Sequence, residues 1–338
     1  EIGPARGLNP EPSAYRTIFY RAGETVRGTL HLNFEKPTKY EKIVLQFTGK
    51  GSTKWNEYQG RRTRRFGGKE RFFLTEKIYL GEVQVLEGEF AHDFEFVLPL
   101  NLPSSYTDKN CKIEYLFKAK LVKPRFMSIA KVVKKHIMVS GFIAAPSDGP
   151  AMFNFKKDLY KVFSNKEYFI SVDVRIESTL VQRGDCFDLQ FTVNNNSDIT
   201  IIAVRAQLVC WTMLYSSGGR CKKKATPISD CVVETVPIAG YSAVTIPCRV
   251  PTTSATYSIQ HSKLIHKTYV LKITLRLPMP HTNMEVDLPV AIGDIGGVPE
   301  PSFSQSTSTA GHEPPPKIAY VGGANEKSMG HENQVFRL

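Results

Sequence analysis

The chain has 338 residues, long enough for two domains of ordinary size. Hydrophobic residues make up 41% and charged residues 22%, the balance of a globular protein rather than a disordered or fibrous one. The longest nearly apolar run, residues 137–145, is far shorter than the ~20 residues that a membrane-spanning helix needs. We therefore expect two globular domains and no transmembrane helix.

Positive charge is concentrated in the first part of the chain. The formal net charge is +12, and residues 1–140 hold 25 Lys and Arg against 15 Asp and Glu, a surplus of ten. Such asymmetry favours acidic peptides, phosphates or anionic membrane surfaces as partners. No recognition helix, zinc-ligand spacing or aromatic RNA-binding strand accompanies the charge, so no nucleic acid partner is expected.

Apolar residues alternate with polar ones in five clear stretches. The stretches are residues 26–34, 170–176, 187–193, 269–277 and 286–292. Alternation places every second side chain on one face of a strand and does not match the 3.6-residue period of a helix. The pattern predicts an all-β protein built from two tandem antiparallel β-sandwich domains of immunoglobulin-like type.

Breaker-rich segments divide the chain. Pro and Gly are concentrated at 144–150, which predicts an N-terminal sandwich over 1–143 and a linker over 144–165. The C-terminal sandwich is then expected over 166–295. Beyond it, residues 296–338 contain few large apolar side chains and are expected to form a disordered tail.

Weak signals recur in the same order in both halves. Gly23-Glu24 and Gly184-Asp185 each precede an alternating strand, and Tyr115 and Tyr269 each begin a similar late strand. Repeated order of this kind is unlikely by chance and indicates an internal duplication.

A basic segment between two strand-like stretches is the main candidate site. Its arginines have fork-shaped guanidinium groups that suit phosphate or carboxylate. The competing interpretation is a solvated loop that only maintains solubility. The run 220–224 is a weaker candidate for membrane or acidic-peptide contact, and the cations of 131–136 are interpreted as an outward strand face. The candidate anion-binding and cargo-binding loop comprises Arg61, Arg62, Arg64, Arg65, Lys69 and Arg71.

No spacing typical of a catalytic, cofactor or metal site occurs in the sequence, so no enzyme activity and no cofactor are expected. Without any Cys-x-x-Cys pair, the six cysteines are interpreted as buried free thiols, with a disulfide among Cys210, Cys221 and Cys231 as the alternative. The sequon at Asn195 to Ser197 is interpreted as a turn.

Several of these segments resemble the arrestin family, in particular its arrestin-domain-containing or α-arrestin branch. The resemblance covers roughly residues 14–295. It is carried by the segments 20–28, 45–49 with Trp55, 113–121, 193–197 and 288–293, in this order and spacing.

The resemblance implies a non-catalytic adaptor in the cytoplasm, recruited to the plasma membrane or endosomes. Such an adaptor binds cytoplasmic tails of membrane proteins and links them to endocytic sorting or to WW-domain ubiquitin ligases. The α-arrestin branch typically recruits these ligases through Pro-Pro-x-Tyr, whereas Tyr320 here lies four positions after the last proline of its group. The weak candidate tail motif is therefore Pro314, Pro315, Pro316 and Tyr320.

Three other functions are compatible with the sequence. An extracellular β-sandwich adhesion or binding protein would have paired cysteines and a glycosylated Asn195. A retromer-like coat subunit would have a fixed partner instead of changing cargo. An enzyme on a β-sandwich would need a convergent polar pocket.

Overall fold

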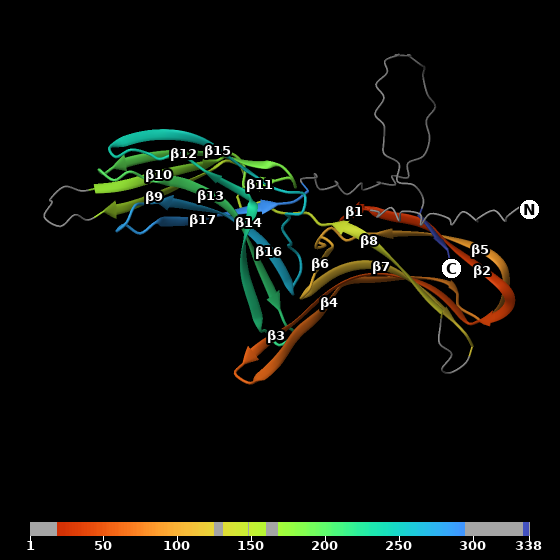
Figure 1. Ribbon diagram of the computed structural model, residues 1–338. Helices are drawn as coiled ribbons and strands as arrows, with labels where there is room; N and C mark the ends of the chain where they lie inside the picture. The colour runs from red at the N-terminus through yellow and green to blue at the C-terminus, as the bar shows by residue number, and fades with distance from the viewer. Residues whose placement is uncertain (1–18, 125–130, 148, 160–167, 295–333, 338) are drawn as a thin grey trace, which may run out of the picture.

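Every regular element that the structure describes is a β-strand (Figure 1). This computed structural model describes residues 19–124, 131–147, 149–159, 168–294 and 334–337. The strands form two sandwiches that lie side by side, each with its own buried core. The predicted all-β fold of two tandem sandwiches is confirmed.

The first sandwich packs a six-stranded sheet on a three-stranded sheet. The larger sheet has the order β1-β8-β7-β3-β4 with β6 paired to β7, and the smaller has the order β18-β2-β5. The strands are β1 (Phe19–Arg21), β2 (Thr25–Tyr40), β3 (Lys42–Gln59), β4 (Arg62–Leu80), β5 (Gln84–Val97), β6 (Tyr106–Asp108), β7 (Cys111–Val122), β8 (Lys131–Ser140) and β18 (Gln334–Arg337).

The second sandwich packs a four-stranded sheet, β15-β12-β10-β9, on a five-stranded sheet, β11-β17-β16-β13-β14. Its strands are β9 (Ala151–Leu159), β10 (Tyr168–Ile176), β11 (Leu180–Val181), β12 (Cys186–Asn196), β13 (Ala203–Tyr215), β14 (Cys221–Glu234), β15 (Ser242–Pro251), β16 (Ile265–Arg276) and β17 (Met284–Ile292).

The duplication is visible in one buried tyrosine of each sandwich. Tyr115 and Tyr269 are both at most 1% exposed. The Tyr115 hydroxyl donates a hydrogen bond of 2.6 Å to the carbonyl of Pro103, and the Tyr269 hydroxyl accepts one of 3.1 Å from the amide of Tyr257. In both sandwiches the partner lies 12 residues earlier in the chain. Each tyrosine therefore connects a central strand of its sheet to a loop that precedes this strand in the chain.

Part of the segment assigned to the linker is a strand. Within 144–165, Ala151–Leu159 forms β9 and pairs antiparallel with β10 at the edge of the second sandwich. Its side chains alternate between exposed and half-buried up to the buried Leu159. Phe153 and Phe155 alternate with polar residues, as expected of an edge strand with one face on the core. The chain therefore enters the second sandwich earlier than the Pro and Gly residues of 144–150 indicate.

Of the tail expected to be disordered, the structure describes only Gln334–Arg337. This segment forms β18 and pairs parallel with β2, with Gln334 opposite Gly28 and Arg337 opposite His31. The rest of 296–338, including the candidate motif at Pro314, Pro315, Pro316 and Tyr320, lies outside the described residues.

Candidate functional site

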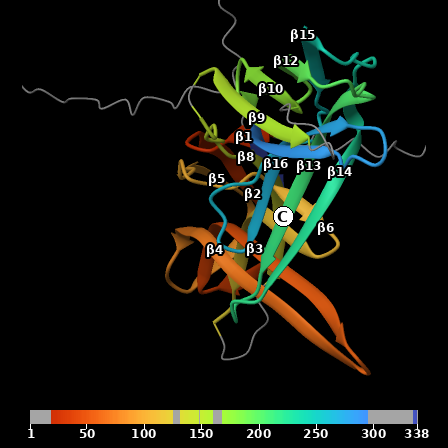
Figure 2. The ribbon, with the colours of Figure 1, turned by 90° about the vertical axis from the view of Figure 1, so that its left-hand side faces the viewer.

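The basic segment lies in a long hairpin rather than in a loop. β3 and β4 stay paired as far as Gln59 and Arg62, which leaves only Gly60 and Arg61 in the turn. Gly60 has a φ of 60°, in the left-handed region that glycine adopts without strain. Figure 2 shows this hairpin projecting beyond the rest of the first sandwich. Cross-strand pairing therefore continues through the exposed charges, and the expected loop is corrected to strand for Arg62, Arg64, Arg65, Lys69 and Arg71.

Strand alternation divides the arginines between the two faces of the hairpin. Arg64 pairs with Glu57 on the face that carries Trp55, and its guanidinium lies 5.7 Å from the ring centroid of Phe66. Arg65 pairs with Asn56 and faces the opposite way. Arg62 shares the face of Arg64, so the six candidate cations do not form one cluster.

The outward face that contains Arg65 continues across the larger sheet of the first sandwich. Lys50 on β3 pairs with Arg71 on β4 and with Glu114 on β7, and Lys118 on β7 pairs with Lys134 on β8. Because directly paired residues share a face, one surface runs from the hairpin to β8. We define this basic face by Lys50, Lys54, Arg65, Lys69, Arg71, Lys112, Lys118, Lys120 and Lys134.

A hollow of about 330 Å³ lies in the centre of the basic face. Lys118, Lys120, Lys134 and Arg71 line its sides. Leu116, which also lines it, is only 3% exposed although it points outward. The aliphatic stems of the surrounding lysines can cover this leucine while their ammonium groups remain in water. The hollow therefore presents charge over an apolar base.

Negative charge does not balance this face. Glu114 is bridged by Lys50 at 2.9 Å and by Lys112, and these hydrogen bonds outweigh burial and lower the pKa of its carboxyl group. Lys118 lacks such a partner among the described residues. Its pKa is lowered by burial and then by the neighbouring charges of Lys120 and Lys134. Lysines that raise one another's free energy in this way are stabilised by an incoming anion.

The second sandwich holds the base of the hairpin. The Glu70 carboxylate accepts hydrogen bonds from the hydroxyl of Ser262 and, at 2.9 Å, from the amide of Lys263. The Thr53 hydroxyl donates to the carbonyl of Tyr215 at 2.7 Å. These contacts fix the hairpin, and with it half of the basic face, relative to the second sandwich.

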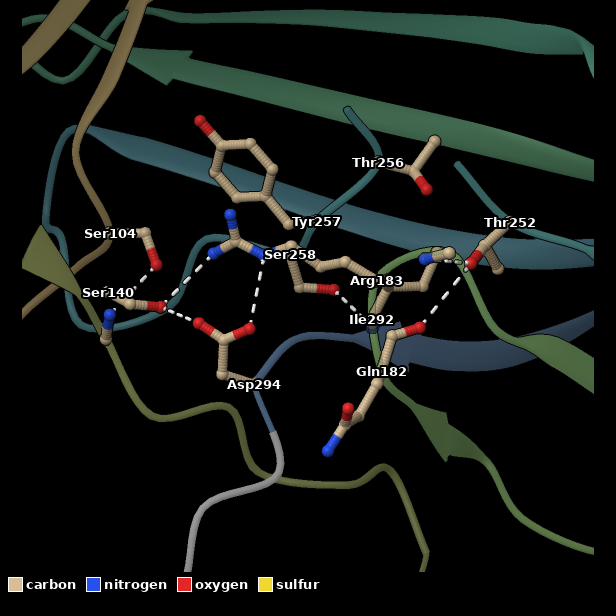
Figure 3. Close-up of polar contacts among 12 residues, drawn as sticks. Ser104, Ser140, Gln182, Arg183, Thr252, Thr256, Tyr257, Ser258, Ile292 and Asp294 are labelled. Carbon is tan, nitrogen blue, oxygen red and sulfur yellow. Dashed lines mark hydrogen bonds and ion pairs between the residues drawn. The ribbon is translucent and has the colours of Figure 1, made fainter. Parts of the chain in front are cut away.

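A second set of polar contacts joins the sandwiches near the end of β8 (Figure 3). The Arg183 guanidinium donates to the Ser140 hydroxyl at 3.2 Å and lies 3.7 Å from Asp294, which also bonds Ser140. The same guanidinium is 4.2 Å from the ring centroid of Tyr257, whose hydroxyl donates to the carbonyl of Ser105 at 3.0 Å. The two sandwiches are thus linked at two separated places.

Sequence reasoning missed most of the basic face. Only Arg65, Lys69 and Arg71 belonged to the predicted set, while Lys118 and Lys120 did not. Their spacing along β7, at alternate positions with Lys112, indicates one outward face and could have been noticed. Their closeness to Lys134 and Lys50 depends on pairing between distant strands.

In the described part of the chain, no group of three or more His, Cys, Asp or Glu side chains is arranged to hold a metal ion. Over the same residues, no helix long and apolar enough to cross a membrane is present.

Comparisons with known proteins agree with this architecture. The arrestin (or S-antigen) N-terminal domain matches residues 14–144, and the arrestin C-terminal domain matches residues 169–296. Two relatives are from Caenorhabditis elegans. Arrestin domain-containing protein 17 is 24% identical over 57% of this chain and 47% of its own length, and protein 15 is 22% identical over 81% and 76%. Human arrestin domain-containing protein 5 is 21% identical over 81% of this chain and 84% of its own length.

The fold is therefore that of the two-sandwich arrestins, with the two domain matches in the same order as the two sandwiches. The chain belongs to the arrestin family, as the sequence resemblance predicted. Its match with the first of these relatives spans about half of that protein's length.

Proposed function

We propose that this protein is a non-catalytic adaptor that binds acidic or phosphorylated cytoplasmic tails of membrane proteins on the basic face. The observation that supports the proposal is the charge of that face. Lys118 and Lys120 of β7 and Lys134 of β8, which have no carboxylate partner among the described residues, lie beside the cations of the β3–β4 hairpin. Adaptor function also fits the family to which the chain belongs.

The chemistry of the basic face suits extended anionic segments. Lysine ammonium groups are mobile point charges that bind phosphate without demanding one geometry. A surface that spans several strands can contact successive acidic or phosphorylated residues of one tail. Single exposed ion pairs contribute only ~0.2–1 kcal/mol, so affinity depends on several contacts acting together.

The same charge would draw the protein to anionic membrane surfaces on the cytoplasmic side, where the tails of membrane proteins are found. Cargo held in this way would be passed to endocytic sorting machinery or to WW-domain ubiquitin ligases. The ligase step stays a prediction about Pro314, Pro315, Pro316 and Tyr320, which lie outside the described residues.

The test is a binding titration with a fluorescent acidic peptide in unphosphorylated and doubly phosphorylated forms, at low and high salt. The variant Lys118→Ser/Lys120→Ser/Lys134→Ser removes three cations from the hollow. Three contacts at ~0.2–1 kcal/mol each amount to roughly 0.6–3 kcal/mol, or about a three- to 150-fold loss of affinity for the phosphorylated peptide. Anionic and neutral vesicles form a parallel arm that reports membrane binding separately.

A matched control removes three cations from the second sandwich. Lys156→Ser/Arg175→Ser/Arg249→Ser changes the net charge equally, but each of these side chains already has a carboxylate partner. The control should bind the peptide as wild type does. If the two triple variants lose affinity equally, only overall charge matters and the proposed site is wrong.

A further inference from the structure

A separate cavity of about 330 Å³ lies where the two sandwiches meet. One wall is β6 of the first sandwich, with Tyr106 and Asp108, together with the turn that follows it. The other is a sheet face of β13, β14 and β16 in the second sandwich. The cavity shares no lining residue with the basic face, so it is an independent site.

Three lysines of the second sandwich point into this cavity. Thr212 on β13 pairs with Lys224 on β14 and with Lys267 on β16, which places both lysines in one row across the sheet. Lys222 lies one row further along the same face, opposite Leu214. Lys224 is exposed at the rim and Lys222 is half-buried. The sheet register therefore directs three ammonium groups toward a single space.

Lys267 is the unusual member of this group because it is only 9% exposed. Its ammonium lies 5.0 Å from the ring centroid of Tyr106 and 4.9 Å from that of Tyr257. Over the described ranges, no carboxylate lies within ion-pair distance of it. Asp108, the acidic residue of the cavity lining, accepts a hydrogen bond from the amide of Lys109 at 2.6 Å.

A bound anion would stabilise Lys267 in its charged form. Burying an ammonium without a carboxylate is unfavourable, and aromatic rings compensate for only part of the lost hydration. Burial accordingly lowers the pKa of Lys267, although nearby Cys210 and Asp108 act in the opposite direction. An anion bound beside Lys267 would supply the missing charge while Lys222 and Lys224 contact its remaining oxygens.

We propose that this cavity binds a small phosphate monoester, with the phosphate at Lys267, Lys222 and Lys224. A dianion matches a lysine cluster that Asp108 alone does not neutralise, and the tyrosine rings of the walls suit an organic substituent. Because both sandwiches line the cavity, the ligand would bind the folded two-domain arrangement and stabilise it against unfolding.

The test is thermal unfolding and calorimetric titration of the full chain with inorganic phosphate, phenyl phosphate and glycerol 3-phosphate, with sodium chloride at matched ionic strength. The two monoesters distinguish an aromatic phosphate from a phosphate like a lipid headgroup. We expect at least one of these phosphates to raise the unfolding temperature well above the effect of chloride. Equal effects of chloride and all three phosphates would overturn the proposal.

Variants on one strand localise the effect. Lys224→Ser should weaken phosphate binding about tenfold, and Lys267→Met should abolish it. Lys223→Ser is the matched control, since Lys223 faces the other side of β14 and lies 4.3 Å from the ring centroid of Trp211. If Lys267→Met does not fold, the comparison of Lys224→Ser with Lys223→Ser remains decisive, and equal binding by these two variants would overturn the proposal. The Lys118→Ser/Lys120→Ser/Lys134→Ser variant should retain full phosphate binding, which separates this site from the basic face.

Discussion

The cysteines differ strongly in how accessible their thiols are. All six are free, with Cys111 and Cys248 buried and Cys221 exposed. Cys210 and Cys221 lie on opposite faces of the β13–β14 hairpin, since Cys210 pairs with Thr226 and Cys221 with Tyr215. A disulfide between these two cysteines is incompatible with this register.

Thiol alkylation should follow this burial. Burial raises the pKa of Cys111 to about 12 and that of Cys248 to about 11, so both thiols remain protonated at pH 8. Because the thiolate is the form that reacts with alkylating agents, both should react slowly. We expect iodoacetamide to modify Cys221 in the native protein at pH 8 and to modify Cys111 and Cys248 only after denaturation. Mass spectrometry of the digested protein measures this, and rapid native alkylation of Cys111 would contradict it.

Asn195 has a structural role that leaves its side chain unavailable for glycosylation in the folded protein. It is 1% exposed, and its amide nitrogen donates to the carbonyls of Ile199 at 2.7 Å and Ala239 at 3.0 Å. Both hydrogens of the amide are thereby used to hold the bend after β12. The interpretation of the whole sequon as a turn is corrected, since Asn195 and Asn196 are the last residues of β12 and only Ser197 lies in the bend.

Removing this amide should destabilise the second sandwich. Asn195→Ala leaves two carbonyls without their partner, which costs roughly 1–3 kcal/mol of unfolding free energy. Asn194→Ala is the control, since Asn194 is an exposed residue of the same strand. Urea denaturation measures both, and equal midpoints for the two variants would show that the buried hydrogen bonds contribute nothing.

At the scale of elements, the β3–β4 hairpin should bind anions with one face only. Arg65→Ser/Lys69→Ser removes two cations from the basic face and should weaken binding of the phosphorylated peptide by roughly 0.5–2 kcal/mol, or about two- to thirtyfold. Arg62→Ser/Arg64→Ser removes the same charge from the opposite face and should have little effect. Fluorescence anisotropy compares the pairs, and a larger loss for the second pair would reverse our assignment of the faces.

Strands with apolar alternation could be predicted from the sequence, whereas the strand that carries the basic segment could not. The alternation of residues 26–34 or 187–193 specifies a strand because neighbouring side chains alone set the pattern. The basic segment lacks an apolar alternation, so its strand character depends on pairing with β3, including Trp55 opposite Phe66. The Pro and Gly residues of 144–150 likewise led to the prediction of a linker where β9 forms. The pairing partner of β9 is β10, which follows it only after residues 160–167.

Contacts between distant segments determine the candidate sites, and these were not predictable from local pattern. Lys118 lies opposite Lys134 because β7 pairs with β8. Glu70 accepts a hydrogen bond from Ser262, which is 192 residues away in the sequence. The duplicated Tyr115 and Tyr269 were found because repetition is itself a sequence signal.

At the scale of the whole molecule, the two sandwiches should unfold as a coupled unit. Glu70 and Asp294 supply carboxylates to the two separated links between them, and hydrogen bonds to charged groups contribute ~1.5–3 kcal/mol when well formed. We expect Glu70→Ala/Asp294→Ala to lower the unfolding temperature and to broaden or divide the transition in scanning calorimetry. The control Asp158→Ala/Glu177→Ala removes exposed carboxylates within the second sandwich. Identical traces for the two double variants would contradict this coupling.

The most direct test of the adaptor proposal is to locate a bound tail by photo-crosslinking. A doubly phosphorylated acidic peptide carrying a benzophenone group would be irradiated with the full chain, and the crosslinked residues identified by mass spectrometry. The account predicts crosslinks concentrated at 50–71, 112–120 and 131–136, competed by unlabelled phosphorylated peptide and reduced by high salt. Specific crosslinks confined to the second sandwich would contradict it.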